Sequence, residues 1–239
     1  MGKRITSQKR GRGTRRYVSL KHRYKGEARH KINIPKIEAA FGTVTKLEHS
    51  PAHSAPLALI RYDDGDEGYI IAPEGIAVGD NISIGNKTEI KKGNTMLLSE
   101  IPIGTDVYNV EKTKGDGGKF VRASGTFAKI LSRTKESVIL LMPSKKEKAF
   151  DGNCMASIGT VAGGGRPEKP FVKAGKRWHA MRAKGKLYPI TSAVAMNAVE
   201  HPFGSGRGRH MGKPSVAPRH APPGRKVGQV RARRTGRIR

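Results

Sequence analysis

The densest group of potentially reactive side chains lies at residues 201–210, whose sequence is HPFGSGRGRH. It contains two histidines, and an imidazole is the side chain best suited to accept and donate a proton near neutral pH. Arg207 and Arg209 can each give paired hydrogen bonds to a phosphate, and the intervening glycines expose backbone N–H groups. A catalytic histidine usually needs an acid to orient it, and the local sequence offers none except Glu200. Phosphate binding is therefore favoured over acid–base catalysis.

Motifs for other chemistries are incomplete, so we predict no metal or cofactor site. His49 and His53 have helical spacing for a shared metal, but Pro51 disfavours that helix. Cys154 is the only cysteine, which excludes a zinc site with two thiolates; we expect it to be a small buried apolar residue. The acidic group at 63–67 lacks the spaced ligands of a calcium loop and is expected to be a solvated turn. No complete nucleotide-binding loop or G-x-S-x-G motif is present.

The charge of +28 is concentrated at the two ends of the chain. Residues 1–36 contain 13 Lys and Arg and one acid, and residues 161–239 contain 19 and two. The 124 residues between them carry 15 basic and 16 acidic groups and are nearly neutral. A neutral body with two cationic arms predicts binding to a polyanion through phosphate neutralisation and counterion release.

Six of the 13 aromatic residues lie in these arms rather than in the body: Tyr17, Tyr24, Phe171, Trp178, Tyr188 and Phe203. Such rings can stack on unpaired bases while arginines pair with phosphates, which is typical of single-stranded RNA binding. The alternative is that some rings, Trp178 in particular, hold an arm against the body.

The neutral body has the pattern of short antiparallel strands. Residues 57–62 and 69–72 flank Asp63-Asp64-Gly65, a turn signal, and predict a hairpin. Ile82 and Ile84 alternate with polar residues, and further β-type runs are found at 107–110, 120–123, 126–131, 138–142 and 155–161. Gly or Pro separates the runs, which favours two small barrels joined near residues 94–102.

The C-terminal segment has a different character. Residues 161–239 contain 12 Gly and 8 Pro, so we expect an extended chain that becomes ordered when its partner neutralises it. A short helix is predicted within 171–184, and no core is expected from His201 onward. No apolar stretch approaches the roughly 18 residues of a membrane span, so no membrane association is predicted.

Several longer strings follow one another in an order typical of one family: RYDDGDEGYIIAPEG, GDNISIG, KKGNTMLLSEIPIGTDVYNVE, RASGTFAKI, CMASIGTV, KAGKRWHAMRAKGK and AMNAVEHPFGSGRGRHMGKP. Over nearly the whole chain they resemble the universal L-two family of the large ribosomal subunit. Phe203 stands where bacterial members usually carry a second histidine. Together with the short N-terminal arm, it resembles the archaeal and eukaryotic cytosolic branch.

The resemblance implies an all-β fold, with an OB-fold barrel followed by an SH3-like barrel and long basic extended N- and C-terminal arms. It divides the chain into an arm at 1–36, the first barrel at 37–95, the second at 96–162 and an extension at 163–239. It also implies a structural, primary rRNA-binding protein of the cytoplasmic ribosome near the peptidyl-transferase region. Its partners would be large-subunit rRNA, neighbouring ribosomal proteins and, through a bridge, the small subunit.

Such a protein is expected to be no enzyme and to need no cofactor of its own, although rRNA can bring structural Mg²⁺ to the interface. It would support subunit association, tRNA binding and peptide-bond formation. Two alternatives stay open, a direct catalytic contribution of His201 and a nonspecific nucleic-acid-compacting protein. With His201 treated as an RNA contact or a loop-shaping residue, the predicted rRNA contacts are Arg10, Arg12, Arg15, Arg16, Arg23, Lys176, Arg177, Trp178, Arg182, His201, Arg207 and Arg209.

Overall fold

The chain forms two compact units in a computed structural model. The sheet unit is Lys21–Pro170, and the terminal unit combines Met1–Leu20 with Phe171–Arg239. The residues that the structure describes are 2–18, 21–31, 39–51, 53–86, 88–134, 137–206 and 208–230. Among them no helix is both long and apolar enough to cross a membrane.

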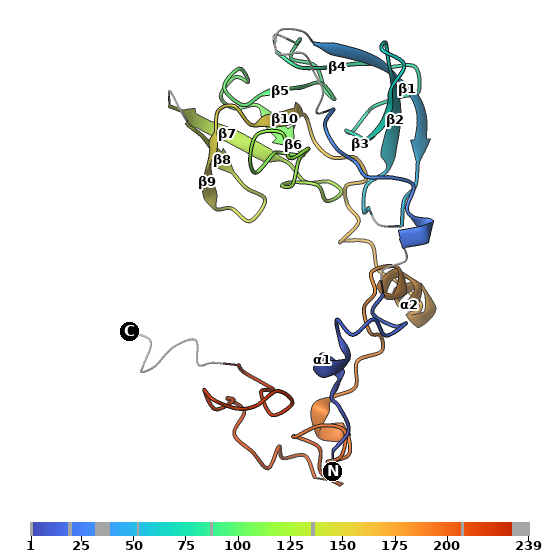
Figure 1. Ribbon diagram of the computed structural model, residues 1–239, viewed down its shortest axis with the longest axis vertical. Helices are drawn as coiled ribbons and strands as arrows, with labels where there is room; N and C mark the ends of the chain where they lie inside the picture. The colour runs from blue at the N-terminus through green and yellow to red at the C-terminus, as the bar shows by residue number, and fades with distance from the viewer. Residues whose placement is uncertain are drawn as a thin grey trace. The chain divides into compact units, whose positions relative to one another are not determined.

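The described part of the sheet unit contains one mixed sheet, with strand order β3-β2-β1-β4-β5-β10-β6-β7-β8-β9 (Figure 1). Its neighbouring strands pair antiparallel, except that β4 and β5 meet in parallel at Ile84 and Thr95. This mostly-β composition was predicted from the sequence. The strands are β1 Ala40–Glu48, β2 Leu57–Tyr62, β3 Glu67–Ile71, β4 Asn81–Ile84, β5 Thr95–Leu97, β6 Asp106–Tyr108, β7 Ala128–Arg133, β8 Ser137–Leu141, β9 Glu147–Asp151 and β10 Met155–Ile158.

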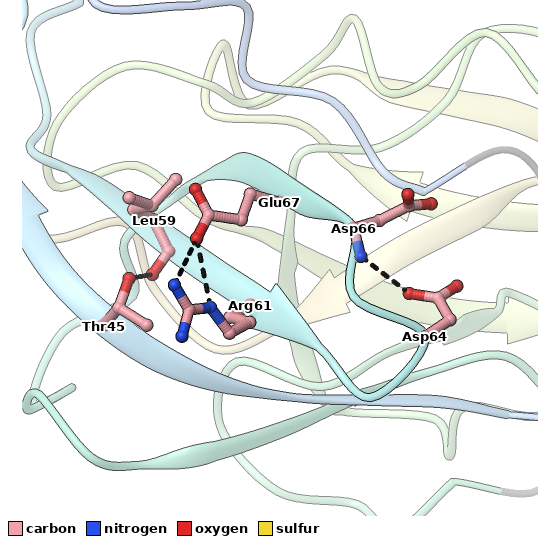
Figure 2. A network of polar contacts seen from close by, with 6 residues as sticks. All are labelled: Thr45, Leu59, Arg61, Asp64, Asp66 and Glu67. Atoms are coloured by element: carbon pink, nitrogen blue, oxygen red, sulfur yellow. Dashed lines mark hydrogen bonds and ion pairs between the residues drawn. The ribbon is translucent and has the colours of Figure 1, made fainter.

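The predicted hairpin is confirmed, because β2 pairs antiparallel with β3. The register runs from Leu57 opposite Ile71 to Arg61 opposite Glu67. Gly65 adopts a φ of 88°, which an L residue rarely reaches, and this lets the turn close. Across the pair the Arg61 guanidinium donates from Nε and Nη2 to Glu67 Oε1 at 3.1 and 3.0 Å (Figure 2). The ion pair lies on the exposed face, so the hairpin depends mainly on its apolar face and its backbone ladder.

The acidic turn of this hairpin is more than a solvated loop. Lys31 pairs with Asp64 and, at 3.2 Å, with Asp66, and its ammonium lies 4.5 Å from the centroid of the Tyr62 ring. The Lys31 side chain is only 9% exposed. Its hydrogen bond lowers the pKa of the Asp64 carboxyl. The expectation of a purely solvated turn was therefore incomplete, because the partner cation lies more than 30 residues earlier in the sequence.

Two apolar clusters lie within the sheet unit. One is built on the strands from β1 to β4 and contains residues such as Val44, Ile60 and Ile82. The larger one contains buried residues of the later strands, among them fully buried Leu140, and also Leu57 of β2 and Ile71 of β3. Each cluster collects the inward side of strands that alternate buried and exposed residues, as a half-buried sheet requires. The larger cluster therefore joins the two halves of the sheet, while the smaller one lies mainly within the first half.

Cys154 belongs to the larger cluster and has no exposed surface, which confirms its prediction as a small buried residue. Burial raises the pKa of its thiol to about 11. The thiol therefore stays protonated at neutral pH and is a poor nucleophile.

A buried carboxylate organises the loop after β6. Glu111 is 1% exposed, and its Oε1 accepts a hydrogen bond from the Gly117 N–H at 3.1 Å. Its Oε2 accepts from Gly115 N at 3.2 Å and from Met155 N at 2.9 Å. One side chain thus satisfies three backbone donors and ties the loop at residues 112–118 to β10.

The chain just before Lys31 connects both halves of the sheet. Ala28 forms an isolated parallel bridge with Tyr69 of β3. Buried His30 hydrogen bonds through Nε2 to the Asn109 carbonyl at 2.6 Å, beyond the end of β6. Residues 28–31 therefore belong structurally to the sheet unit, although their composition is that of the cationic arm.

The terminal unit has little regular structure, and its described elements are α1 Thr6–Lys9, α2 Ala174–Ala183 and η2 Ala193–Ala195 (Figure 1). α2 confirms the helix predicted within 171–184, and none of its residues is buried. Ile5, Phe203 and Val227 form a small apolar cluster. The expectation of no core beyond His201 was therefore wrong, because the N-terminal segment supplies the missing apolar residue.

Candidate nucleic-acid interface

The candidate site is built around the loop at residues 201–206 in the terminal unit. Phe203 is 4% exposed and packs with Ile5 and Val227, so its ring anchors the loop and is not free to stack on a base. The His201 ring lies 5.3 Å from the Phe203 ring, centroid to centroid. The loop is therefore held by one apolar side chain rather than by regular secondary structure.

The hydrogen bonding of His201 indicates its protonation state. The Phe203 backbone N–H donates to His201 Nδ1 at 3.0 Å, so Nδ1 is the unprotonated nitrogen of the neutral ring. Desolvation lowers the pKa of His201, which also favours the neutral form at pH 7. Glu200, the acid nearest in sequence, pairs instead with Lys3 Nζ at 3.8 Å. This arrangement fits a loop-shaping residue better than an oriented general base.

The turn that carries His201 requires a glycine. The Gly204 N–H donates to the His201 carbonyl at 2.9 Å, and the His201 N–H donates to the Asn197 carbonyl at 3.2 Å. A Cβ on Gly204 would lie 2.4 Å from the Asn197 carbonyl oxygen and 2.7 Å from that of Met196. Since both obstacles are backbone atoms, only a shift of the turn could accommodate a side chain.

We predict that Gly204→Ala loosens this turn, while Gly206→Ala is tolerated because no atom lies within 4 Å of a Cβ there. Overpacking of this kind costs about 1–3 kcal/mol. Hydrogen–deuterium exchange should show faster exchange at residues 197–204 in the first variant only. Equal exchange in the two variants would show that the close approach at Gly204 is unimportant.

The predicted cationic contacts are exposed side chains spread over two separate segments. Arg10, Arg12, Arg15, Arg16, Arg23, Lys176, Arg177, Arg182 and Arg209 are all exposed, and Arg207 lies outside the described residues. The first four follow α1, and Lys176, Arg177 and Arg182 lie on α2. None of these described cations forms an ion pair with a described carboxylate. Their charges are available to an external polyanion, and their individual roles stay predictions.

Three of the predicted arginines lie over aromatic rings. The guanidinium carbon of Arg182 is 5.0 Å from the centroid of Trp178, and that of Arg177 is 5.2 Å from the centroid of Tyr188. A third pair joins Arg10 to Tyr17 at 5.8 Å. Cation–π contact holds each guanidinium beside a ring that is partly open to solvent. Such pairs can offer a phosphate donor and a stacking surface together.

Four cations around a hollow in the terminal unit were not among the rRNA contacts predicted from the sequence. Lys3, Arg4, Lys213 and Arg225 all line it, and they come from both ends of the chain. Their local sequence resembles the rest of the arms, so only the pairing of the two terminal segments distinguishes them. Among the described residues no group of His, Cys, Asp and Glu is arranged to hold a metal ion.

Comparisons with known proteins cover nearly the whole chain. Residues 2–84 match the family model for "Ribosomal Proteins L2, RNA binding N-terminal domain", and residues 91–221 match "Ribosomal Proteins L2, C-terminal domain". Large ribosomal subunit protein uL2 of Archaeoglobus fulgidus is 52% identical over 236 residues, which are 99% of each chain. The uL2 protein of Halorubrum lacusprofundi is 51% identical, and the match covers 99% of this chain and 98% of that protein. The uL2 protein of Methanothermobacter thermautotrophicus is 47% identical, and the match covers 100% of both chains.

Proposed function

The chain belongs to the ribosomal protein L2 family, uL2, close to its archaeal members, and from this membership we propose how its parts act in the ribosome. It is a structural, RNA-binding component of the large ribosomal subunit that takes part in translation, and it is not an enzyme. The distribution of charge supports different roles for the body and the arms, because a nearly neutral body separates two cationic terminal regions.

The sheet unit is proposed to consist of an OB-fold barrel at 37–95 and an SH3-like barrel at 96–162. The smaller apolar cluster supports this division, since all of its buried residues lie between Val44 and Ile84, whereas the larger one contains most buried residues of 96–162 and also Leu57 and Ile71. At the proposed boundary, β5 is joined to β4 by one residue pair, Ile84 with Thr95, and the two family models also meet between residues 84 and 91. Two rigid bodies of this kind would fix where each arm enters the rRNA.

The arms at 1–36 and 163–239, apart from residues 28–31 that lie in the sheet unit, are proposed to follow narrow paths between rRNA helices. The observation that carries this proposal is the set of exposed cations without carboxylate partners described above. Phosphate contacts fix position and orientation without reading sequence, and the exposed ring of Trp178 would stack on an unpaired base.

The loop at 201–206 is proposed to lie toward the peptidyl-transferase region, and another surface of the protein to take part in a bridge to the small subunit. His201 would shape the loop or contact RNA. Its neutral ring, and the engagement of Glu200 with Lys3, support a positioning role over proton transfer.

The test is to assemble large subunits with the wild-type chain and with His201→Gln. Both chains should sediment with the particle at high salt, and the chemical step, corrected for the fraction assembled, should keep most of its rate. Removing a general base would instead slow it by about 10²–10⁴-fold. A loss of that size in correctly assembled subunits would establish catalysis by His201, and failure of the wild-type chain to sediment would contradict the ribosomal role.

A further inference from the structure

A hollow of about 450 Å³ lies within the terminal unit, beside the loop that carries His201. The N-terminal residues 2–5 form one side, and residues 198–199, 201–202 and 223–225 form the others. The two terminal segments are in close contact beside it, since a Cβ on Gly224 would lie 3.0 Å from Gln8 Nε2. Its volume is within the range of about 300–1,000 Å³ that is usual for small-molecule sites.

The hollow is cationic. Lys3, Arg4, Lys213 and Arg225 line it, and no Asp or Glu is among its described lining residues. Lys3 reaches Glu200 at 3.8 Å, which leaves the other three without a carboxylate partner among the described residues. Concentrated positive charge beside a concave wall favours an anionic ligand.

Arg225 identifies the kind of ligand more closely. Its Nη1 is buried and has no hydrogen-bond partner among the described residues. A buried donor left unpaired is costly, so a turn of the Arg225 side chain that brings Nη1 to an acceptor in the hollow would remove a penalty as well as add a bond. A phosphate oxygen is the acceptor that matches a guanidinium in geometry and charge.

Gln8 and His201 also line the hollow, and the larger of the remaining lining side chains are apolar, so a bare anion would leave these uncovered. Ile5, Val199, Pro202 and Pro223 line the hollow together with the cations. A flat, largely apolar group attached to the anion would cover these side chains. A nucleotide combines both parts, since its phosphate is charged and its base has apolar faces.

We propose that this hollow holds one unpaired nucleotide of the rRNA, with its phosphate on Arg225 and Arg4 and its base against Val199 and Pro202. This proposal rests on the rRNA binding proposed above and makes it specific to one position. The two ends of the protein would close around the nucleotide together, because the N-terminal segment supplies Arg4 and the extension supplies Arg225.

The experiment compares large subunits assembled with the wild-type chain, Arg225→Gln and Arg219→Gln. Arg219 is exposed in the same extension and does not line the hollow, so it controls for the loss of one positive charge. The rRNA is probed with dimethyl sulfate at the bases and with a 2′-hydroxyl acylating reagent. In the Arg225→Gln particles one nucleotide should become more reactive to both reagents, reflecting a roughly tenfold weaker site.

The proposal would be overturned if the rRNA had the same reactivity in the Arg225→Gln and Arg219→Gln particles. It would also be overturned if the Arg225→Gln particles changed in 2′-hydroxyl reactivity without a change at a base, or changed only at a paired base. If Arg225→Gln does not assemble, the exposed lining residue Lys213 is replaced by Gln, with the same readout and a smaller expected change. Assembly is measured by sedimentation in every case. If wild-type particles assemble but no nucleotide is protected from the two reagents, this inference alone is contradicted. If the wild-type chain does not assemble, the ribosomal role is contradicted.

Discussion

Replacing Glu111 with Gln is expected to lower the free energy of unfolding of the sheet unit by about 2–4 kcal/mol. The Glu111 carboxylate accepts from Gly117 on one oxygen and from Gly115 and Met155 on the other. A glutamine has one acceptor oxygen, and its NH₂ group must face at least one of these N–H donors. The variant therefore loses charge-assisted hydrogen bonds and leaves a buried donor unpaired.

Urea unfolding of the full chain, followed by far-ultraviolet circular dichroism, measures this change. The matched control is Glu147→Gln, which removes the same charge from an exposed position on β9 and should change stability by less than about 0.5 kcal/mol. The dependence on urea concentration should be similar in the two variants, since the surface exposed on unfolding is unchanged. Equal stabilities would mean that water replaces the missing acceptor and that Glu111 does not hold the loop.

The parts of the fold that were predicted from sequence are those in which short-range pattern and tertiary structure agree. The runs at 57–62 and 69–72 correspond closely to β2 and β3, because turn residues and alternating burial specify the same hairpin. The run at 120–123 did not become a strand, and only Phe120 forms a bridge there, with Val110. Residues 109–110 do pair with 120–121, but Val121 adopts a φ of 54°, outside the extended region, so the pairing ends after one bridge.

The parts that were missed depend on residues far apart in the chain. Glu111 has the composition of a surface acid, and only the folded loop shows that it is surrounded by backbone donors. Lys31 likewise reads as part of a cationic arm, yet it completes the acidic turn at Asp64. The hollow next to His201 needs both termini, so no local window of sequence could indicate it.

Deleting residues 201–239 is expected to weaken binding to an rRNA fragment strongly while the sheet unit stays folded. The deleted segment carries 11 Lys and Arg and no acid, out of a net charge of +28. If about half of these cations contact phosphates, the slope of log K against log salt becomes shallower by about 4, since each contact contributes about 0.7–0.9. Fluorescence anisotropy over a series of salt concentrations measures the slope.

The sheet unit should stay folded because both of its apolar clusters are built from residues no later than Ala162.

A shorter deletion, residues 231–239, tests the loss of charge without the loss of the apolar cluster. It removes five arginines and leaves Phe203 and Val227 to pack on Ile5. If charge alone matters, the two deletions should weaken binding in proportion to the cations that they remove. A larger loss for the longer deletion at high salt, where phosphate contacts are screened, would assign additional binding energy to the loop at 201–206 and the hollow beside it. A melting transition of the sheet unit that disappears on the longer deletion would instead place the extension in its core and contradict the separation of body and arms.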